Sequence, residues 1–290
     1  MTRRSIEGSA LTILQAIILG LTQGITEFAP VSSSGHLILV PWLFGWPILN
    51  NADLNKTFDV ALHIGTLIGA VAYFRKDIWR YLLAWFASIR ERRIGTTDQR
   101  IAWALVIGTI PGVIAGALLE DVIQEHLGEP WIIAVMLAVF GVVLYAVDRA
   151  FAQDRGLDDV TPKRGWWLGV AQALALQPGV SRSGVTITAA RVYRFERATA
   201  ARVSFLLALP IIAGAGVYKG IDLAKTGIPE GFAGPFIAGM IAAAISGFVV
   251  IWWLLGYLRR RSLAVFMWYR LTVAALVFVV IATGFRSATI

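Results

Sequence analysis

The sequence lacks cysteine, and charged residues are scarce in it. Of 290 residues, none is cysteine and 15% are Asp, Glu, Lys or Arg. The absence of thiols excludes disulfides, thiolate metal sites and a cysteine nucleophile, but it leaves oxygen-ligated metals open. Hydrophobic residues make up 57% of the chain, and the mean hydropathy is +0.70. This composition is typical of an integral membrane protein.

The excess of basic residues does not point to nucleic acid. The net charge is +8, and Lys and Arg gather in short segments such as 90–100, 191–202 and 259–261. In membrane proteins, basic residues concentrate in cytoplasmic loops. We therefore predict membrane lipids as partners and no nucleic acid.

Six apolar segments are long enough to cross a bilayer core of about 30 Å. They are Phe58–Phe74, Ile101–Leu119, Trp131–Val147, Val203–Tyr218, Phe236–Tyr257 and Ala264–Gly284. The stretch Ile78–Ile89 is amphipathic and carries Trp and Tyr, so we predict that it is interfacial rather than spanning. Shorter apolar arms flank two polar breaks, which predicts two re-entrant helical hairpins. The predicted fold is an all-α integral membrane protein with six transmembrane helices and two re-entrant hairpins.

The first polar break runs from Gln23 to His36 and has the sequence Q-G-I-T-E-F-A-P-V-S-S-S-G-H. Polar and ionisable groups at membrane depth are costly and usually face a cavity. Pro30 blocks a continuous helix, and Gly35 permits unusual backbone angles. We predict a broken helix whose free amides converge with three hydroxyls on an anion. These hydroxyls belong to Ser32, Ser33 and Ser34.

The second polar break, Gln177 to Thr186, has the sequence Q-P-G-V-S-R-S-G-V-T. Its centre is Arg182, which lies between Ser181 and Ser183. A guanidinium in that setting offers planar, bidentate recognition of a phosphate. The first break adds three further groups, namely Glu27 as a base or cation ligand, His36 as a proton carrier and Ser33 as a candidate nucleophile.

An internal repeat relates the two breaks. A shift of 149 residues aligns Gly20 with Gly169, Gln23 with Gln172, Ser32 with Ser181, Ser34 with Ser183 and Gly35 with Gly184. Each half, about 8–148 and about 163–286 of one membrane domain, then holds one hairpin and three crossings. Because three is odd, the second half is predicted to be inverted relative to the first, with binding groups meeting near the midplane.

Each singled-out residue also has an ordinary structural interpretation. A serine cluster in a membrane helix usually satisfies its own backbone, and Arg182 also fits a basic cytoplasmic flank. Glu27 and His36 near the serines favour a functional site. His63 is predicted to be a helix-packing residue, because no second ligand lies one turn away.

The two breaks together closely resemble the motifs of the undecaprenyl pyrophosphate phosphatases, the bacitracin-resistance family. The motifs E-F-A-P-V-S-S-S-G-H and P-G-V-S-R-S-G-V-T carry the resemblance, and it extends over the whole chain in length, segment order and repeat. It implies hydrolysis of undecaprenyl diphosphate to the monophosphate and phosphate, which recycles the lipid carrier of cell-wall synthesis and confers bacitracin resistance. It also implies a multi-pass protein of the bacterial inner membrane, with an active site open to the extracytoplasmic side.

The resemblance implies roles for individual residues. Glu27 becomes a metal ligand or base, supported by Gln23, where many relatives have a second glutamate. Ser33 or a water is the nucleophile, His36 the general acid or base, and Arg182 the phosphate anchor. Hydrogen bonds to the phosphate are assigned to Ser32, Ser34, Ser181, Ser183 and Thr186. A divalent cation, Mg²⁺, Ca²⁺ or Mn²⁺, is the implied cofactor.

A flippase or transporter of undecaprenyl monophosphate is the alternative function. The inverted repeat and the broken helices at mid-membrane favour it. A carrier needs charge compensation, whereas hydrolysis needs a nucleophile beside a base. The grouping of Glu27, Ser33 and His36 fits hydrolysis better. The sequence leaves a homodimer open.

Overall fold

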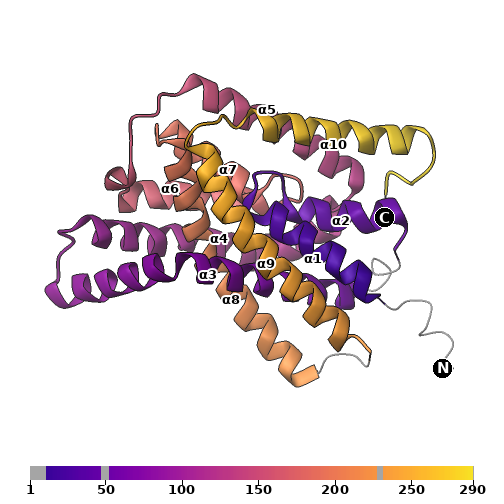
Figure 1. Ribbon diagram of the computed structural model, residues 1–290, viewed down its shortest axis with the longest axis horizontal. Helices are drawn as coiled ribbons and strands as arrows, with labels where there is room; N and C mark the ends of the chain where they lie inside the picture. The colour runs from indigo at the N-terminus through magenta and orange to yellow at the C-terminus, as the bar shows by residue number, and fades with distance from the viewer. Residues whose placement is uncertain (1–10, 47–51, 227–230, 290) are drawn as a thin grey trace.

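The computed structural model describes residues 11–46, 52–226 and 231–289, and this part of the chain is built from helices (Figure 1). The helices are α1 (Ile13–Phe28), α2 (Ser33–Phe44), α3 (Ala52–Glu91), α4 (Thr97–Leu127), α5 (Pro130–Ala150), α6 (Pro162–Ala173), α7 (Arg182–Val192), α8 (Arg197–Thr226), α9 (Ala233–Leu258) and α10 (Ala264–Ala282), with short 3₁₀ turns at Leu157–Asp159 and Leu174–Leu176.

Six helices in the described residues are long and apolar enough to cross a membrane. They are α3, α4, α5, α8, α9 and α10. The helices α1 and α2 are apolar but shorter, and together they form the first hairpin. The helices α6 and α7 form the second hairpin. The all-α membrane fold with six spans plus shorter helices is thereby confirmed.

The crossing predicted to end at Phe74 and the interfacial stretch predicted at Ile78–Ile89 are parts of one helix. The structure has one continuous helix of 40 residues, α3, across this stretch and the preceding apolar crossing. The polar residues after Phe74 include neither proline nor glycine, so nothing in the local sequence stops the helix. Asp77 further ties this part of α3 to α8, because its carboxylate accepts a bond of 2.6 Å from Arg202.

The chain breaks are narrower than the polar stretches that predicted them. The first hairpin leaves helical geometry between the end of α1 at Phe28 and the start of α2 at Ser33, so Gln23, Glu27 and His36 are all helical. The second hairpin opens between the 3₁₀ turn that ends at Leu176 and the start of α7. Polar side chains therefore project from rigid helix ends rather than from long loops.

Each hairpin packs against the opposite half of the chain. The helix α1 lies along α9, α6 lies along α4, and α5 pairs with α10. Figure 1 shows α1 and α2 toward the right, α6 toward the left, and α5 beside α10 along the upper edge. Reciprocal packing of this kind supports the repeat of one hairpin and three crossings. The halves at about 8–148 and 163–286 stay a prediction, and residues 8–10 lie outside the described residues.

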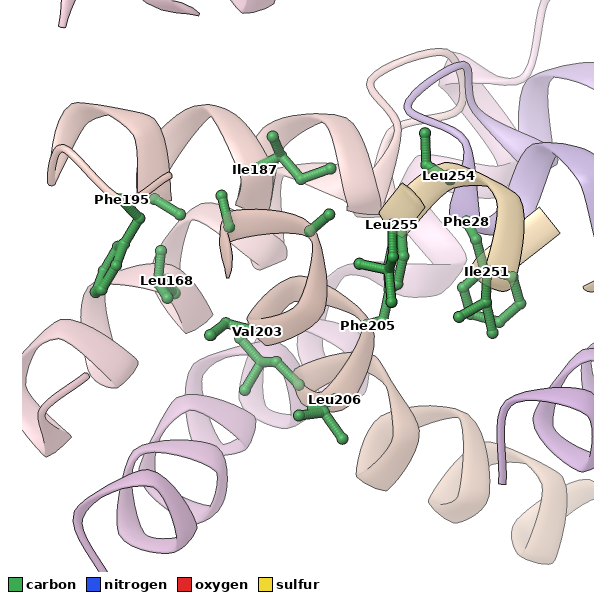
Figure 2. Close-up of a cluster of buried hydrophobic side chains, with 14 of the residues drawn as sticks. Phe28, Leu168, Ile187, Phe195, Val203, Phe205, Leu206, Ile251, Leu254 and Leu255 are labelled. Carbon is green, nitrogen blue, oxygen red and sulfur yellow. The ribbon is translucent and has the colours of Figure 1, made fainter. Parts of the chain in front are cut away.

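The largest cluster of buried apolar side chains lies where both hairpins meet the crossings. Figure 2 shows Phe28 at the end of α1 close to Ile251 of α9, with Phe205 of α8 nearby. The Phe28 and Phe205 rings meet edge to face, with centroids 5.3 Å apart. Ile187 of α7 belongs to the same cluster and is fully buried. The cluster holds the end of α1 and the start of α7 against the same helices.

Glycines set the distance between each hairpin and its supporting crossing. A Cβ on Gly20 of α1 would lie 2.3 Å from the carbonyl oxygen of Gly239 in α9. A Cβ on Gly169 of α6 would lie 2.0 Å from the carbonyl oxygen of Gly108 in α4. Small residues permit this close approach of membrane helices. The positions match under the 149-residue repeat, so the two hairpins are seated in the same way.

We expect Gly169→Ala to destabilise the fold by about 3 kcal/mol, because the new methyl group must push two backbones apart. Gly116→Ala on α4 is the matched control, since a Cβ there meets no atom within 4 Å. Thermal unfolding of both variants in detergent tests this. Equal midpoints for the two variants would contradict the close-packing interpretation.

Candidate active site

The two hairpin tips have the same backbone shape. Ser32 and Ser181 precede α2 and α7 and have φ angles of 76° and 75°. Positive φ is unusual for residues other than glycine and often marks a functional site. Each serine caps its helix, since Ser32 Oγ accepts a bond of 3.4 Å from Gly35 N and Ser181 Oγ accepts one of 3.1 Å from Gly184 N. Both glycines of the motifs therefore belong to a cap.

Hydrogen bonds join the two tips to each other. The amide of Gly179 donates to Ser32 Oγ at 3.0 Å. In the reverse direction, Ser183 Oγ donates to the carbonyl of Ala29 at 3.0 Å. The tips are thus one bonded unit, although 147 residues separate Ser32 from Gly179. This confirms that the two breaks converge, as the repeat suggests.

Glu27 is the centre of the polar cluster, and its side chain is 2% exposed. One carboxylate oxygen, Oε1, pairs with Nη2 of Arg182. The other, Oε2, accepts a bond of 2.6 Å from Ser33 Oγ and one of 3.1 Å from Gln23 Nε2. The ring nitrogen Nε2 of His63 lies 3.6 Å from the same oxygen. Four of these five side chains are residues that the motifs singled out.

Ser33 and Arg182 occupy equivalent places in the repeat. Each is the first residue of its helix, α2 or α7, and the two are 149 residues apart. The pseudo-symmetry therefore brings a hydroxyl and a guanidinium onto the two oxygens of one carboxylate. The counterpart of Glu27 is Leu176, and the counterpart of His36 is Val185. The backbone repeats, but the second half has neither the carboxylate nor the imidazole of the first.

His63, predicted to be a helix-packing residue rather than a ligand, lies at the contact between α3 and α1. Its side chain is 31% exposed and lies against the carboxylate of Glu27. Its Nδ1 lies 2.8 Å from the carbonyl oxygen of Asp59, which fixes the ring orientation along α3. The sequence did not predict the neighbour of His63, because Glu27 belongs to α1, across a helix interface. A histidine within an apolar span was the available signal.

His36 is held away from the carboxylate in this structure. Its Nδ1 lies 2.7 Å from the carbonyl oxygen of Ser32, and its Nε2 lies 2.8 Å from the hydroxyl of Tyr269 on α10. A proton on Nδ1 satisfies the carbonyl and leaves Nε2 to accept from the tyrosine. Ser33 instead bonds to Glu27. The acid or base role of His36 stays a prediction.

The other predicted phosphate ligands serve the tips themselves. The hydroxyls of Ser32 and Ser34 are 3.4 Å apart, and those of Ser181 and Ser183 are 3.2 Å apart. Thr186 donates to the carbonyl of Arg182, its own helix neighbour. These bonds shape the tips around the site. Their contact with phosphate stays a prediction.

Sequence reasoning missed Arg270, which is fully buried in the middle of α10. Its guanidinium donates to carbonyls of both hairpin tips, at 3.2 Å to Pro30, 2.8 Å to Gly179 and 3.1 Å to Val180. A Cβ on Gly184 would lie 3.1 Å from Nη1 of this arginine, so the motif glycine also makes room for it. A lone arginine within an apolar crossing was the available signal.

Gln23 and Glu27 fit the oxygen ligands of a hard cation. Gln23 is fully buried, and its Oε1 has no hydrogen-bond partner. A free amide oxygen beside a carboxylate suits Mg²⁺ or Ca²⁺, which take oxygen ligands. The described residues hold no group of three or more His, Asp or Glu suited to a metal. Such a cation would therefore depend on further oxygens from water and from the substrate.

The fold and the site define a multi-pass helical membrane protein whose two hairpins bring together one buried carboxylate, a hydroxyl and a guanidinium. The imidazole of His63 lies beside them on α3. The family model "Bacitracin resistance protein BacA" matches residues 16–276. The chain therefore belongs to this family.

Curated relatives extend over nearly the whole chain. A protein of Geobacter sulfurreducens is 46% identical over 262 residues, which is 90% of this chain and 95% of the relative. A protein of Moorella thermoacetica is 46% identical over 267 residues, covering 92% of this chain and 97% of the relative. A protein of Pelobacter propionicus is 42% identical over 275 residues, covering 94% and 99%. All three are named undecaprenyl-diphosphatase.

Proposed function

We propose that this chain is a membrane phosphatase that hydrolyses undecaprenyl diphosphate to undecaprenyl monophosphate and inorganic phosphate. The observation that carries the proposal is the carboxylate of Glu27, which binds Arg182 through one oxygen and the hydroxyl of Ser33 through the other. One carboxylate thus contacts the proposed phosphate anchor and can accept the proton of the proposed nucleophile. The names of the relatives and the family match support the same reaction. Recycling of the lipid carrier and bacitracin resistance follow from it.

Arg182 is the residue that recruits the substrate. Its side chain is 20% exposed, whereas that of its partner Glu27 is 2% exposed. An incoming diphosphate exchanges the carboxylate for phosphate oxygens on the accessible side of the guanidinium, in the bidentate geometry that arginine favours. The same exchange frees one oxygen of Glu27 from its ion pair. Substrate binding thereby raises the basicity of the group that faces Ser33.

Ser33 is placed to attack the terminal phosphorus. Its proton passes to Oε2 of Glu27, the Ser33 oxygen bonds to phosphorus, and the bond from that phosphorus to the bridging oxygen breaks. The leaving group is the lipid monophosphate. Water then hydrolyses the phosphoserine and releases phosphate. A direct attack by water, with Glu27 or His36 as its base, is the alternative chemical route.

Gln23 and Glu27 are the residues proposed to hold a divalent cation, Mg²⁺, Ca²⁺ or Mn²⁺. When bound, such a cation neutralises phosphate oxygens and makes the phosphorus easier to attack. The unpartnered amide oxygen of Gln23 supports this assignment. Arg182 contributes the remaining positive charge from the second hairpin.

We further propose that the protein resides in the bacterial inner membrane with its site open to the extracytoplasmic side. The basic turn between α3 and α4 and the basic residues that follow α9 support a cytoplasmic position for that end of the molecule. The first hairpin, which carries Glu27, begins at the opposite end (Figure 1). The diphosphate group then enters from the side where the carrier is released during cell-wall synthesis.

Brief turnover of C55 diphosphate by the purified full chain, followed by an acid quench and peptide mass spectrometry, tests the reaction and its nucleophile. We expect phosphate release with a divalent cation, phosphate trapped on Ser33, and at least a hundredfold loss of kcat in Ser33→Ala. Ser246→Ala is the control, because its hydroxyl bonds to the carbonyl of Ala242 within α9.

The outcomes separate the alternatives. If the released phosphate contains solvent oxygen and no phosphoserine is trapped, the attack is by water. The proposed hydrolase activity would then stand, and only the nucleophile would change. Absence of phosphate release by the folded wild type would overturn the proposal, and movement of the monophosphate across proteoliposomes would then be the next assay.

A further inference from the structure

A hollow of about 300 Å³ lies away from the Glu27 cluster, beside the start of α6. Arg155, Lys163 and Arg164 line it with two residues that carry hydroxyls, Thr161 and Tyr193. No acidic side chain lines it, and the reaction proposed above uses none of these residues. Three positive charges around one hollow require a negative occupant or solvent to balance them.

Two acidic residues of this region are paired with other cations. Asp148 binds Arg191 at 3.0 Å and Arg197 at 2.8 Å. Asp154 pairs with Arg194. Within the described residues, the ion pairs of this region leave out all three cations of the hollow. Asp159 accepts a bond of 3.0 Å from the amide of Gly156, and neither Asp159 nor Asp158 nor Glu196 lines the hollow. The three basic side chains therefore face the hollow without an acidic partner in its lining.

The guanidinium groups of the hollow are held in place by backbone carbonyls. Arg155 Nη1 donates to the carbonyl of Tyr193 at 3.1 Å, and Arg164 donates to the carbonyl of Asp159. The backbone of Arg155 also pairs with that of Phe195 in an isolated β-bridge, which joins the two walls of the hollow. Groups fixed in this way lose little conformational freedom when they bind a ligand.

The residues around the hollow favour a position at the membrane surface. They belong to the connection between α5 and α6, the first turn of α6 and the end of α7. Next to it on α6, Trp166 is 39% exposed and Trp167 is 50% exposed. Exposed tryptophans are typical of the interface between lipid headgroups and hydrocarbon. Figure 1 shows α6 at the same end of the molecule as the turn between α3 and α4, which carries Arg92 and Arg93.

We propose that this hollow binds the phosphate group of an anionic membrane phospholipid. Lys and Arg near a membrane surface attract anionic headgroups, and basic pockets among membrane helices bind lipid phosphates. The adjacent tryptophans favour a lipid over free phosphate, because they place the hollow where headgroups lie. The inference does not depend on the phosphatase reaction, since the hollow and the Glu27 cluster share no residue.

The test uses the full chain in neutral detergent, titrated with dioctanoyl phosphatidylglycerol and followed by native mass spectrometry. We expect the wild type to retain one phosphatidylglycerol and to bind phosphatidylcholine at least tenfold more weakly. The double variant Arg155→Gln/Lys163→Gln should lose about 30-fold in affinity, since each basic residue contributes about a factor of five. The double variant Arg90→Gln/Arg92→Gln is the control, with the same charge change at the exposed C-terminal end of α3.

Thermal unfolding checks that the double variant Arg155→Gln/Lys163→Gln is folded. If it is not, the single variant Lys163→Gln replaces it, because this position is exposed. The expected loss of phosphatidylglycerol affinity is then about fivefold. Equal phosphatidylglycerol affinity in both double variants would overturn the proposal. Binding of inorganic phosphate as tight as that of phosphatidylglycerol would also overturn it, because the site would then be one for free phosphate.

Discussion

Glu27→Gln is expected to reduce kcat by at least a thousandfold while the protein stays folded. The substitution keeps the size of the side chain and removes the charge that pairs with Arg182. It also removes the acceptor that binds the Ser33 hydroxyl at 2.6 Å. Positioned general bases contribute about 10²–10⁴-fold to rate, and the loss of the ion pair misplaces the phosphate anchor in addition. Phosphate release from C55 diphosphate measures the effect.

Glu91→Gln is the control for this variant, because the same atoms change at the exposed end of α3. It should turn over like the wild type. Thermal unfolding of Glu27→Gln separates lost chemistry from lost structure. A folded Glu27→Gln protein with more than a tenth of the wild-type kcat would show that the carboxylate is not the proton acceptor.

Most of the fold could be predicted from the lengths of the apolar runs and from the internal repeat. Six apolar runs predicted six crossings, because a helix must satisfy its own backbone in hydrocarbon. Matched polar motifs 149 residues apart predicted two hairpins that meet. The error at α3 has a local cause. A cluster of charges after Phe74 looks like the end of a crossing, yet Asp77 pairs with Arg202 of α8 and the helix continues.

The site residues that could be predicted are those that belong to the two polar motifs. Glu27, Ser33 and Arg182 belong to the two polar breaks, and the structure brings all three together. His63 and Arg270 belong to apolar crossings, and their partners come from other helices. Spacing along the chain contains no information about such contacts. The unusual charge of each residue within an apolar run was the remaining sign that it has a partner.

Arg270 is the residue that fixes the two hairpin tips relative to α5. Besides its bonds to Pro30, Gly179 and Val180, its Nε donates to the carbonyl of Leu137 at 2.9 Å. The planar guanidinium can reach carbonyls in several directions at once, whereas the three donors of lysine lie on one nitrogen. Each carbonyl that loses its partner away from water costs about 1–3 kcal/mol.

Arg270→Lys is therefore expected to lower kcat by about a hundredfold per folded molecule, although the positive charge is kept. The tips that carry Ser33 and Arg182 lose their common support, and a misplacement of about 1 Å can cost about a hundredfold in rate. The matched control is Arg191→Lys. Arg191 is equally buried, but it binds Asp148 and the carbonyls at the far end of α7.

Both lysine variants should lower the midpoint of thermal unfolding, because both leave buried carbonyls without a donor. Catalysis distinguishes them. If the two variants keep the same kcat per folded molecule, Arg270 stabilises the fold alone. If Arg270→Lys alone loses kcat and forms phosphoserine at Ser33 correspondingly slowly, the arginine positions the reacting groups. In that case Arg270, which does not bond to Glu27, determines whether Arg182 and Ser33 are in place to contact the two oxygens of the Glu27 carboxylate.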